Sequence, residues 1–359
     1  WLALSLPACA SELEVSLDPR VELAAALELL GSSEPPRAFR PSGAYGAALL
    51  SGVRGCAGHP AVGAYARLRR GARADWPAQA LVELTSCLDD ALAVKAREEC
   101  RRSALAASAA DFASACGFKA ALAKAAESVA PALTDLREKA AQKDLLALFR
   151  EYTGLEPGAT RVAPSPALAP GRFWTGLDRE GRSFSIVSAL SPAPGEPLRF
   201  RWRPVALEVW HENGHGVLDA LAAPSAPPPG LKTASCYESW SQCVREHMAQ
   251  GLALRMAQWS AVDGKLATPP SRHKNPRLPF QEKLADRLAE FEKDRTRWPT
   301  LREFYPRWAD ALGARPATTA AAAARAETTA PDPELSAAVA LAASDPRAAE
   351  AALSALSER

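Results

Sequence analysis

The sequence predicts an α+β protein that is predominantly α-helical and contains one small antiparallel sheet. Residues 59–152 are rich in Ala, Leu, Lys, Arg and Glu, which favours a series of helices. Between residues 154 and 203, Gly and Pro recur among short apolar runs, as expected for strands joined by turns. A histidine pair at helical spacing follows directly, at 211 and 215. The sheet is therefore expected to precede the helix that contains this pair.

The N-terminal elements are predicted to be a strand at 13–17 and a helix from about 21 to 30. The dipeptide Asp18-Pro19 leads into that helix, because Pro suits a first helical turn. Glu22 falls in the first turn, where an acid is favoured by the helix dipole. Residues 32–58 are expected to be mostly loop with one short helix.

The predicted sheet contains three short apolar runs, at 173–174, 184–187 and 198–202. The sequence Asp-Arg-Glu-Gly at 178–181 is typical of a hairpin turn, so two of the runs are expected to be antiparallel neighbours. This small sheet lies immediately before the helix with the histidine pair.

Residues 211–215 have the sequence His-Glu-Asn-Gly-His, which matches the HExxH pattern. On a helix, histidines four residues apart lie on one face, so both rings can bind one cation. The glutamate beside the first histidine can then take a proton from a metal-bound water. The motif predicts His211 and His215 as Zn²⁺ ligands and Glu212 as the general base of a metallopeptidase. The alternative is a pair of ordinary core histidines in a helical protein.

The segment around the motif has the features of a mostly buried helix. Pro204 suits its first turn. Gly214 and Gly216 are poor helix formers, each worse than alanine by about 1 kcal/mol, which indicates close approach by another backbone or by a substrate. Apolar side chains recur at helical spacing at Val205, Val209, Leu218 and Leu221.

A catalytic zinc site needs a third protein ligand and one open position. The downstream candidates are Cys236, Glu238, Cys243, Glu246 and His247. Residues 235–238 form an S-x-x-E capping box, which gives Glu238 a structural role at a helix start. Glu246 lies more than two turns deeper, on a face of mostly small or uncharged residues, where an unpaired acid is costly to bury. We therefore favour Glu246 as the third ligand. The alternatives are a salt-bridged surface glutamate at this position, His247, and a Cys243 thiolate.

Further segments match a pattern that extends beyond HExxH. They are residues 16–23, 58–62, 240–246, 291–295 and 298–306, within about residues 14 to 312. Together they resemble an uncharacterised bacterial family, domain of unknown function 4932, whose members are similar to gluzincin-type metallopeptidases. The resemblance implies a zincin-like catalytic core with Glu246 as the third zinc ligand. Arg245 and Gln250 flank this glutamate, and neither reproduces the Asp that supports a zinc-bound His in some gluzincins.

Glu22 and His59 each have two interpretations. Besides its place in a first helical turn, Glu22 lies near the site if the family resemblance holds. His59 either approaches the metal site or has a turn or capping role at the start of the helical series.

Two further features are expected near a metal site. The last run of the sheet, 197–203, or its neighbour is the candidate edge strand to which a peptide substrate adds as another strand. A purely structural sheet is an equal alternative. Residues 281–312 predict two amphipathic helices broken at Pro299. Arg295 and Tyr305 are candidate oxyanion or substrate residues, with an Arg–Asp surface pair and a helix-packing tyrosine as the alternatives.

Composition excludes some functional classes. The net charge is +2, from 43 basic and 41 acidic residues without a dense basic block, so nucleic acid is not expected as a partner. No apolar run approaches the roughly 20 residues that span a bilayer. The expected partner is a peptide or protein substrate.

The N-terminus and the cysteines indicate export. Residues 1–10 resemble the end of a secretory signal peptide with an A-x-A cleavage site at 8–10. Residues 6–9 also resemble a lipobox, in which Cys9 would be the lipid anchor; a short apolar strand is the other interpretation. Six cysteines follow, at 56, 87, 100, 116, 236 and 243. They predict either disulfides of an exported protein or buried free thiols, and Cys236 and Cys243 are too far apart on one helix to bond each other.

Four regions result: a leader at 1–10, an N-terminal strand and helical region at 11–153, a zincin-like metallopeptidase core at 154–313, and an Ala/Pro-rich linker with a weak helix at 314–359. The predicted function is that of an exported bacterial zinc metallopeptidase, periplasmic, secreted or lipid-anchored. One alternative is a catalytically silent zincin-like binding or scaffold module of the cell envelope. Another is a helical adaptor in which HExxH occurs by chance and binds no metal.

Overall fold

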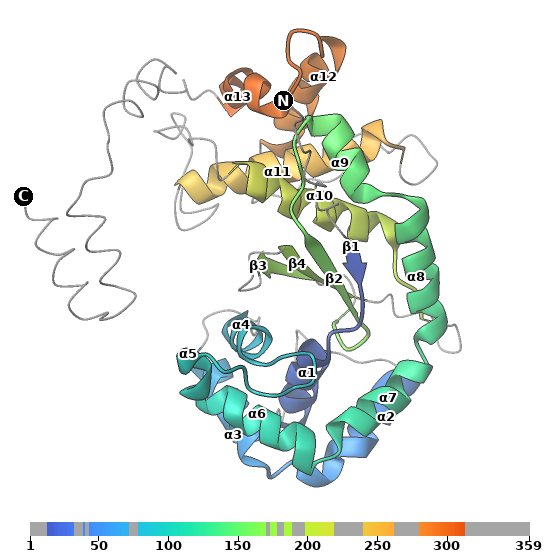
Figure 1. Cartoon of the computed structure of the whole chain (residues 1–359), viewed down its shortest axis with the longest axis vertical. Helices are drawn as coiled ribbons and strands as arrows, with labels where there is room; N and C mark the ends of the chain where they lie inside the picture. Colours follow the sequence, from blue (N-terminus) through green and yellow to red (C-terminus); the bar gives the residue numbers. More distant parts are fainter. Residues whose placement is uncertain are drawn as a thin grey trace, which may run out of the picture.

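A four-stranded sheet lies between two groups of helices in the computed structural model of the chain (Figure 1). The structure describes residues 13–31, 39, 43–71, 78–169, 173–177, 183–188, 198–218, 240–261 and 280–312. The predicted leader at 1–10, the region 314–359, and the candidate residues Cys236 and Glu238 lie outside these ranges.

The first group of helices surrounds α1 (Pro19–Gly31), which is buried from Arg20 to Glu28 and packs against α2, α3, α4 and α7. The predicted N-terminal strand and helix are both present. The strand β1 (Leu13–Val15) precedes this group and belongs to the sheet. The helices of the group are α1, α2 (Gly43–Val53), η1 (Arg54–Cys56), α3 (Pro60–Gly71), α4 (Ala78–Cys87), α5 (Glu98–Arg101), α6 (Ala104–Ala115) and α7 (Phe118–Glu127).

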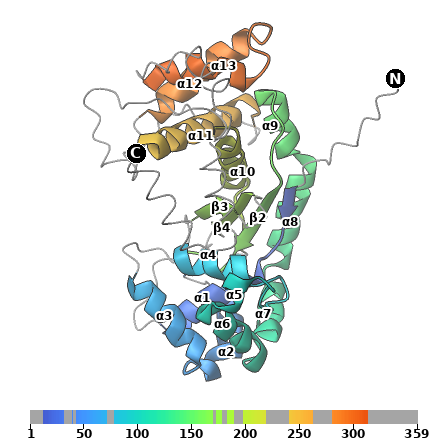
Figure 2. The ribbon, with the colours of Figure 1, turned by 60° about the vertical axis from the view of Figure 1, so that its left-hand side comes forward.

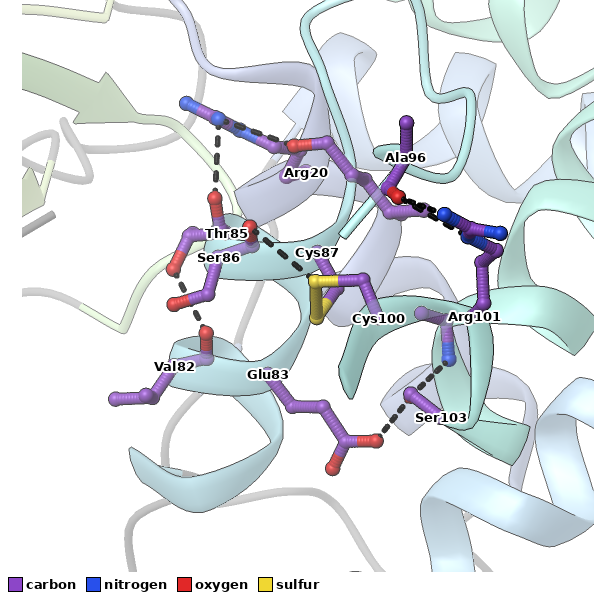
Figure 3. The surroundings of a disulfide bond; sticks show 12 residues. Arg20, Val82, Glu83, Thr85, Ser86, Cys87, Ala96, Cys100, Arg101 and Ser103 are labelled. Carbon is purple, nitrogen blue, oxygen red and sulfur yellow. Dashed lines mark hydrogen bonds between the residues drawn. A yellow bond between two sulfur atoms is a disulfide. The ribbon is translucent and has the colours of Figure 1, made fainter. Parts of the chain in front are cut away.

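Two disulfides join elements of this group. Cys56 at the end of η1 is bonded to Cys116 after α6, and Cys87 at the end of α4 is bonded to Cys100 in α5. The second bond lies beside Arg20, which donates to the carbonyl oxygens of Thr85 (3.1 Å) and Leu88 (3.3 Å) (Figure 3). The prediction of disulfides is confirmed for these four cysteines, and free thiols are excluded there.

The sheet is mixed, so the prediction of an antiparallel sheet is wrong for most of it. Its order is β1-β2-β4-β3, with β2 at Thr160–Ser165, β3 at Phe173–Leu177 and β4 at Ser183–Ser188. β1, β2 and β4 are parallel, and β3 and β4 are antiparallel neighbours, as the hairpin pattern predicts. β2 is buried along its whole length, which is typical of a parallel strand covered on both faces.

Among the described residues of the run at 197–203, Arg199 makes a single β-bridge, and α10 (Trp202–Leu218) begins three residues later, so the predicted final strand is reduced to that bridge. The edge strands of the described sheet are therefore β1 and β3.

The second group of helices is built on α10, which packs against β2, β3 and β4 and also against α11 (Trp240–Trp259). α11 packs in turn against α12 (Gln281–Lys293), and α12 packs against α13 (Leu301–Ala309) and η4 (Asp310–Leu312). Pro204 lies in the first turn of α10, and Pro299 separates α12 from α13, both as predicted.

Two helices, α8 (Ala130–Gln142) and α9 (Leu145–Thr153), run along one side and connect the two groups (Figure 2). α8 packs beside β1, and α9 packs against α10, where the Trp210 indole donates to the Leu145 carbonyl (2.9 Å). Because β1 pairs with β2, the sheet takes strands from both the 11–153 and the 154–313 regions. In the described part of the chain, every helix is too short or too polar to cross a bilayer.

Candidate metal centre

The HExxH residues lie in the middle of α10, where this helix packs closely on α11. Gly214 is buried against α11, and a Cβ atom on it would lie 3.4 Å from Ala249 Cα. The contact therefore accommodates glycine or alanine at this position but no larger side chain. The expected close approach of a second backbone is confirmed at Gly214. It is not found at Gly216, around which a Cβ would meet nothing within 4 Å.

His211 and His215 on α10 and Glu246 on α11 come together at this contact. The Nε2 atoms of His211 and His215 are 3.0 Å apart. Glu246 Oε2 lies 3.5 Å from His211 Nε2, and Glu246 Oε1 lies 3.5 Å from His215 Nε2. All three side chains are partly buried, and among the described residues they form the one group of His, Cys, Asp or Glu with spacing suited to a metal ion.

These separations match a single tetrahedral ion. Nitrogen and oxygen ligands 2.0–2.1 Å from a tetrahedral Zn²⁺ are about 3.3 Å from one another. Here the two ring nitrogens are 3.0 Å apart, each lies 3.5 Å from a different oxygen of Glu246, and one ligand atom from each residue lies within 4.8 Å of the others. Two imidazoles and one carboxylate are also a donor set that Zn²⁺ uses in catalytic sites. The residues therefore fit zinc both in type and in spacing.

Glu212 lies beside the three donors without joining them. Its Oε1 is 3.8 Å from His211 Nε2, and its side chain is largely buried. This position is suited to accepting a proton from a molecule held between the donors.

The electrostatics of the site favour a cation. Burial, together with the charges of Glu212 and Glu246, raises the pKa of Glu208 to about 7, while His211 opposes the shift. Burial lowers the pKa of His211, but the hydrogen bond to Glu246 and the charges of Glu208, Glu212 and Glu246 outweigh it, so the pKa is raised. A concentration of buried carboxylates of this kind is relieved by a bound positive ion.

Asn213 fixes the motif helix to the sheet. Its Oδ1 accepts from the Gly158 backbone N–H (2.8 Å), and its Nδ2 donates to Thr160 Oγ1 (2.9 Å) and to the Val209 carbonyl (2.8 Å). Neither Asn213 nor Glu208 is identified by sequence reasoning. An amide inside HExxH and an acid three residues before it are weak signals, because solvent-exposed helices contain the same residues.

The competing third ligands turn away or are already bonded. The Nδ1–H of His247 donates to the Cys243 carbonyl oxygen (2.8 Å), the ring packs near Phe280, and burial lowers its pKa. Cys243 is disulfide-bonded, so it offers no thiolate. The remaining cysteines, Cys9 and Cys236, lie outside the described residues.

The two candidate oxyanion residues differ in position. The guanidinium of Arg295 donates to the carbonyls of Tyr152 and Pro299 and lies 4.1 Å over the Phe291 ring. None of its recorded contacts involves the metal donors. Tyr305 is buried in α13, which raises its pKa to about 12 against the opposing charge of Arg245. Arg245 directly precedes Glu246, so the charge that acts on Tyr305 comes from the helix that contains Glu246.

Glu22 and His59 have structural roles. Glu22 is fully buried in the first turn of α1 and accepts a hydrogen bond from the Tyr45 hydroxyl (2.5 Å). His59 Nδ1 accepts from the Ala61 backbone N–H (3.2 Å) at the start of α3, and its Nε2 lies 3.2 Å from Asp111. The capping interpretation of His59 is confirmed.

Comparison with known proteins gives no match among family models, curated proteins or solved structures. The resemblance to the uncharacterised bacterial family therefore stays a prediction, and the function must be argued from the site.

Proposed function

We propose that this chain is a zinc-dependent metallopeptidase with a zincin-like core formed by α10, α11 and the sheet. The observation that supports the proposal is the convergence of His211, His215 and Glu246 from two different helices, with one ligand atom from each residue within 4.8 Å of the others. Two core histidines need no carboxylate between them, and a surface glutamate would not be held against both rings. The spacing is that of ligands around one ion.

The reaction is divided among four side chains. His211, His215 and Glu246 would hold the ion. Zn²⁺ bound there would act as a Lewis acid that polarises the scissile carbonyl and makes water more acidic. Glu212 takes the proton from the attacking water and passes it to the leaving amine. Its buried position beside His211 keeps the carboxylate directed at the donors rather than at solvent.

The substrate class follows from the sheet. β3 is an edge strand whose one described neighbour is β4, and α10 packs against it. An extended peptide that pairs with an edge strand gains backbone hydrogen bonds irrespective of its side chains. We therefore assign a peptide or protein substrate, with β3 in place of the run at 197–203 as the strand that receives it.

The disulfides support the proposal that the chain acts outside the cytoplasm. Cys56–Cys116 and Cys87–Cys100 are the kind of crosslink that persists in oxidising compartments. This agrees with the expectation of export from the N-terminal sequence.

Metal analysis and digestion of a peptide library test the proposal. The full chain is expected to contain one zinc and to cleave peptides. Glu212→Gln should keep the zinc and lose hydrolysis, whereas His215→Ala should lose both. His59→Ala is the matched control, because this histidine is occupied at a helix cap, and it should keep both.

Each outcome has a defined meaning. Equal hydrolysis by wild type and Glu212→Gln contradicts the proposed mechanism. Zinc without hydrolysis in the wild type favours the binding or scaffold module, and absence of zinc from every preparation favours the helical adaptor.

A further inference from the structure

Glu208 is a buried acid to which the proposed mechanism gives no role. It lies on α10 one turn before Glu212 and is 8% exposed. Its Oε2 atom is buried and has no hydrogen-bond partner within the described structure. An unpaired buried carboxylate oxygen is strongly unfavourable. A residue retained in this state points to a partner acquired in another state of the protein.

A second unpaired atom lies on the same helix. His211 turns Nε2 toward Glu246 and His215, and its Nδ1 is buried without a hydrogen-bond partner among the described residues. A metal-binding histidine generally donates its other ring N–H to a carboxylate or a carbonyl, which fixes the ring and its tautomer. His211 lacks such an acceptor in the structure as it stands.

The two unpaired atoms belong to neighbouring positions. Residues three apart on a helix have Cβ atoms about 5–6 Å apart and share a face. Glu208 and His211 each influence the other's charge state. The other groups acting on Glu208 are the carboxylates of Glu212 and Glu246, which cannot donate a hydrogen bond when ionised. Of these three groups, His211 is the natural donor.

The nearby polar residues are already engaged. Asn213 is held by Gly158, Thr160 and Val209. His247 bonds within its own helix, to the Cys243 carbonyl. Neither can support the His211 ring without breaking contacts that fix α10 or α11.

We propose that Glu208 is a positioning residue that accepts the Nδ1–H of His211 and thereby presents Nε2 to the metal. The inference rests on the proposed zinc site and adds to it the carboxylate that orients a ligand. The Glu208 hydrogen bond selects the tautomer with the proton on Nδ1, so the Nε2 lone pair is free for the ion. Removing such a support typically lowers metal affinity by about 10–100-fold.

Zinc affinity and the His211 tautomer test the role of Glu208. In chelator competition, Glu208→Gln is expected to bind zinc about 10–100-fold more weakly than wild type. Glu28→Gln is the matched control, because Glu28 is also buried in a helix but is held by Tyr65 and Arg69. It should bind zinc as wild type does. In zinc-bound wild type, ¹⁵N NMR should show His211 protonated on Nδ1.

The outcomes separate this inference from the proposed function. Wild-type zinc affinity in Glu208→Gln, or an Nε2-protonated His211 in the wild type, overturns the role of Glu208 and leaves the zinc site intact. The tautomer measurement needs no variant, so it decides the question even if Glu208→Gln fails to fold. A wild-type chain without zinc affinity overturns the proposed function instead.

Discussion

The α1–α7 helices and the α10–α11 pair both bury acids, but they surround them differently. In the first group, Asp18 is bonded to Arg20, and Glu28 accepts from Tyr65 (2.8 Å) with Arg69 nearby. In the second, the recorded groups around Glu208 are an imidazole and two further carboxylates. The acids of the first group have donors within the fold, whereas those of the second have like charges and a histidine.

This difference separates two reasons for burying charge. A buried acid with a guanidinium or phenol partner has part of its desolvation offset inside the folded chain. Several acids around two imidazoles gain a further offset from an added cation. The first arrangement therefore serves the fold, and the second serves a ligand. Changes to one region should leave the other's property unaffected.

Removal of a disulfide is expected to give the largest loss, confined to the first region. Cys56 and Cys116 are separated by 60 residues. Constraint of a loop of this length contributes about 4 kcal/mol to stability. The double variant Cys56→Ser/Cys116→Ser should lose about that much free energy of unfolding in urea. The shorter Cys87–Cys100 loop, 13 residues, should contribute about 3 kcal/mol. A fall in the zinc affinity of folded protein in either variant would show that the regions are coupled.

A pH effect of the next size is expected from Glu22. Burial raises its pKa from 4.5 to about 7, and one carboxylate oxygen has no hydrogen-bond partner among the described residues. The folded state thus holds this proton more tightly than the unfolded state. Its contribution is complete below pH 4.5 and is lost as the pH rises through 7. This shift corresponds to about 3 kcal/mol.

Comparison of wild type with Glu22→Gln isolates this effect, because the two proteins share every other titratable group. Urea midpoints measured at pH 5 and pH 8 should fall more in wild type than in the variant. The amide still accepts from Tyr45, so the local packing is preserved. Identical pH dependence in both proteins would show that protonation of Glu22 does not contribute to the stability of the folded state.

The sequence predicts the local parts of this structure and fails on the non-local ones. His211 and His215 follow from helical spacing alone, and Glu246 follows from the cost of an acid on a face of small residues. The pairing of β1 with β2 joins Leu13 to Thr160, more than 100 residues apart, which no local pattern contains. The run at 198–202 has the composition of a strand, but it makes only a single β-bridge at Arg199 before α10 begins at Trp202.

The roles of individual residues likewise depend on non-local packing that the sequence does not show. Glu208 is indistinguishable in the sequence from a solvated helix acid, since its burial arises from packing between α10 and its neighbours. Arg295 is a residue of the type that can donate to an oxyanion, but its guanidinium donates instead to carbonyl oxygens at the end of α9 and after α12. The partner of Cys56 depends on the approach of η1 to the end of α6, which spacing does not reveal.

Zinc should stabilise the second region by an amount set by its affinity. A ligand that binds only the folded state, present at 100 times its Kd, adds about 2.7 kcal/mol. Wild type and Cys56→Ser/Cys116→Ser should gain this stability equally in thermal or urea unfolding. His215→Ala should gain none, and His59→Ala should respond as wild type does. Stabilisation of His215→Ala by zinc would show that the metal binds elsewhere.

The smallest expected effect comes from two glycines of α10 that differ only in their surroundings. A Cβ on Gly214 would lie 3.4–3.5 Å from Ala249 and Leu252, so a methyl group fits and a longer side chain does not. Gly216 is exposed and meets nothing within 4 Å. Gly214→Leu should therefore lose about 2 kcal/mol through overpacking. Gly216→Leu should gain up to about 1 kcal/mol from helix propensity.

Zinc affinity distinguishes the two leucine variants more sharply than stability does. A leucine at 214 must displace α11 from α10, which moves Glu246 away from the rings of His211 and His215. Gly214→Leu should therefore bind zinc more weakly even where it remains folded, whereas Gly214→Ala and Gly216→Leu should bind it as wild type does. Chelator competition on the folded variants measures this. Undiminished affinity in Gly214→Leu would mean that the separation of the two helices does not set the distance between the metal donors, and that the second region is held together by something other than their contact.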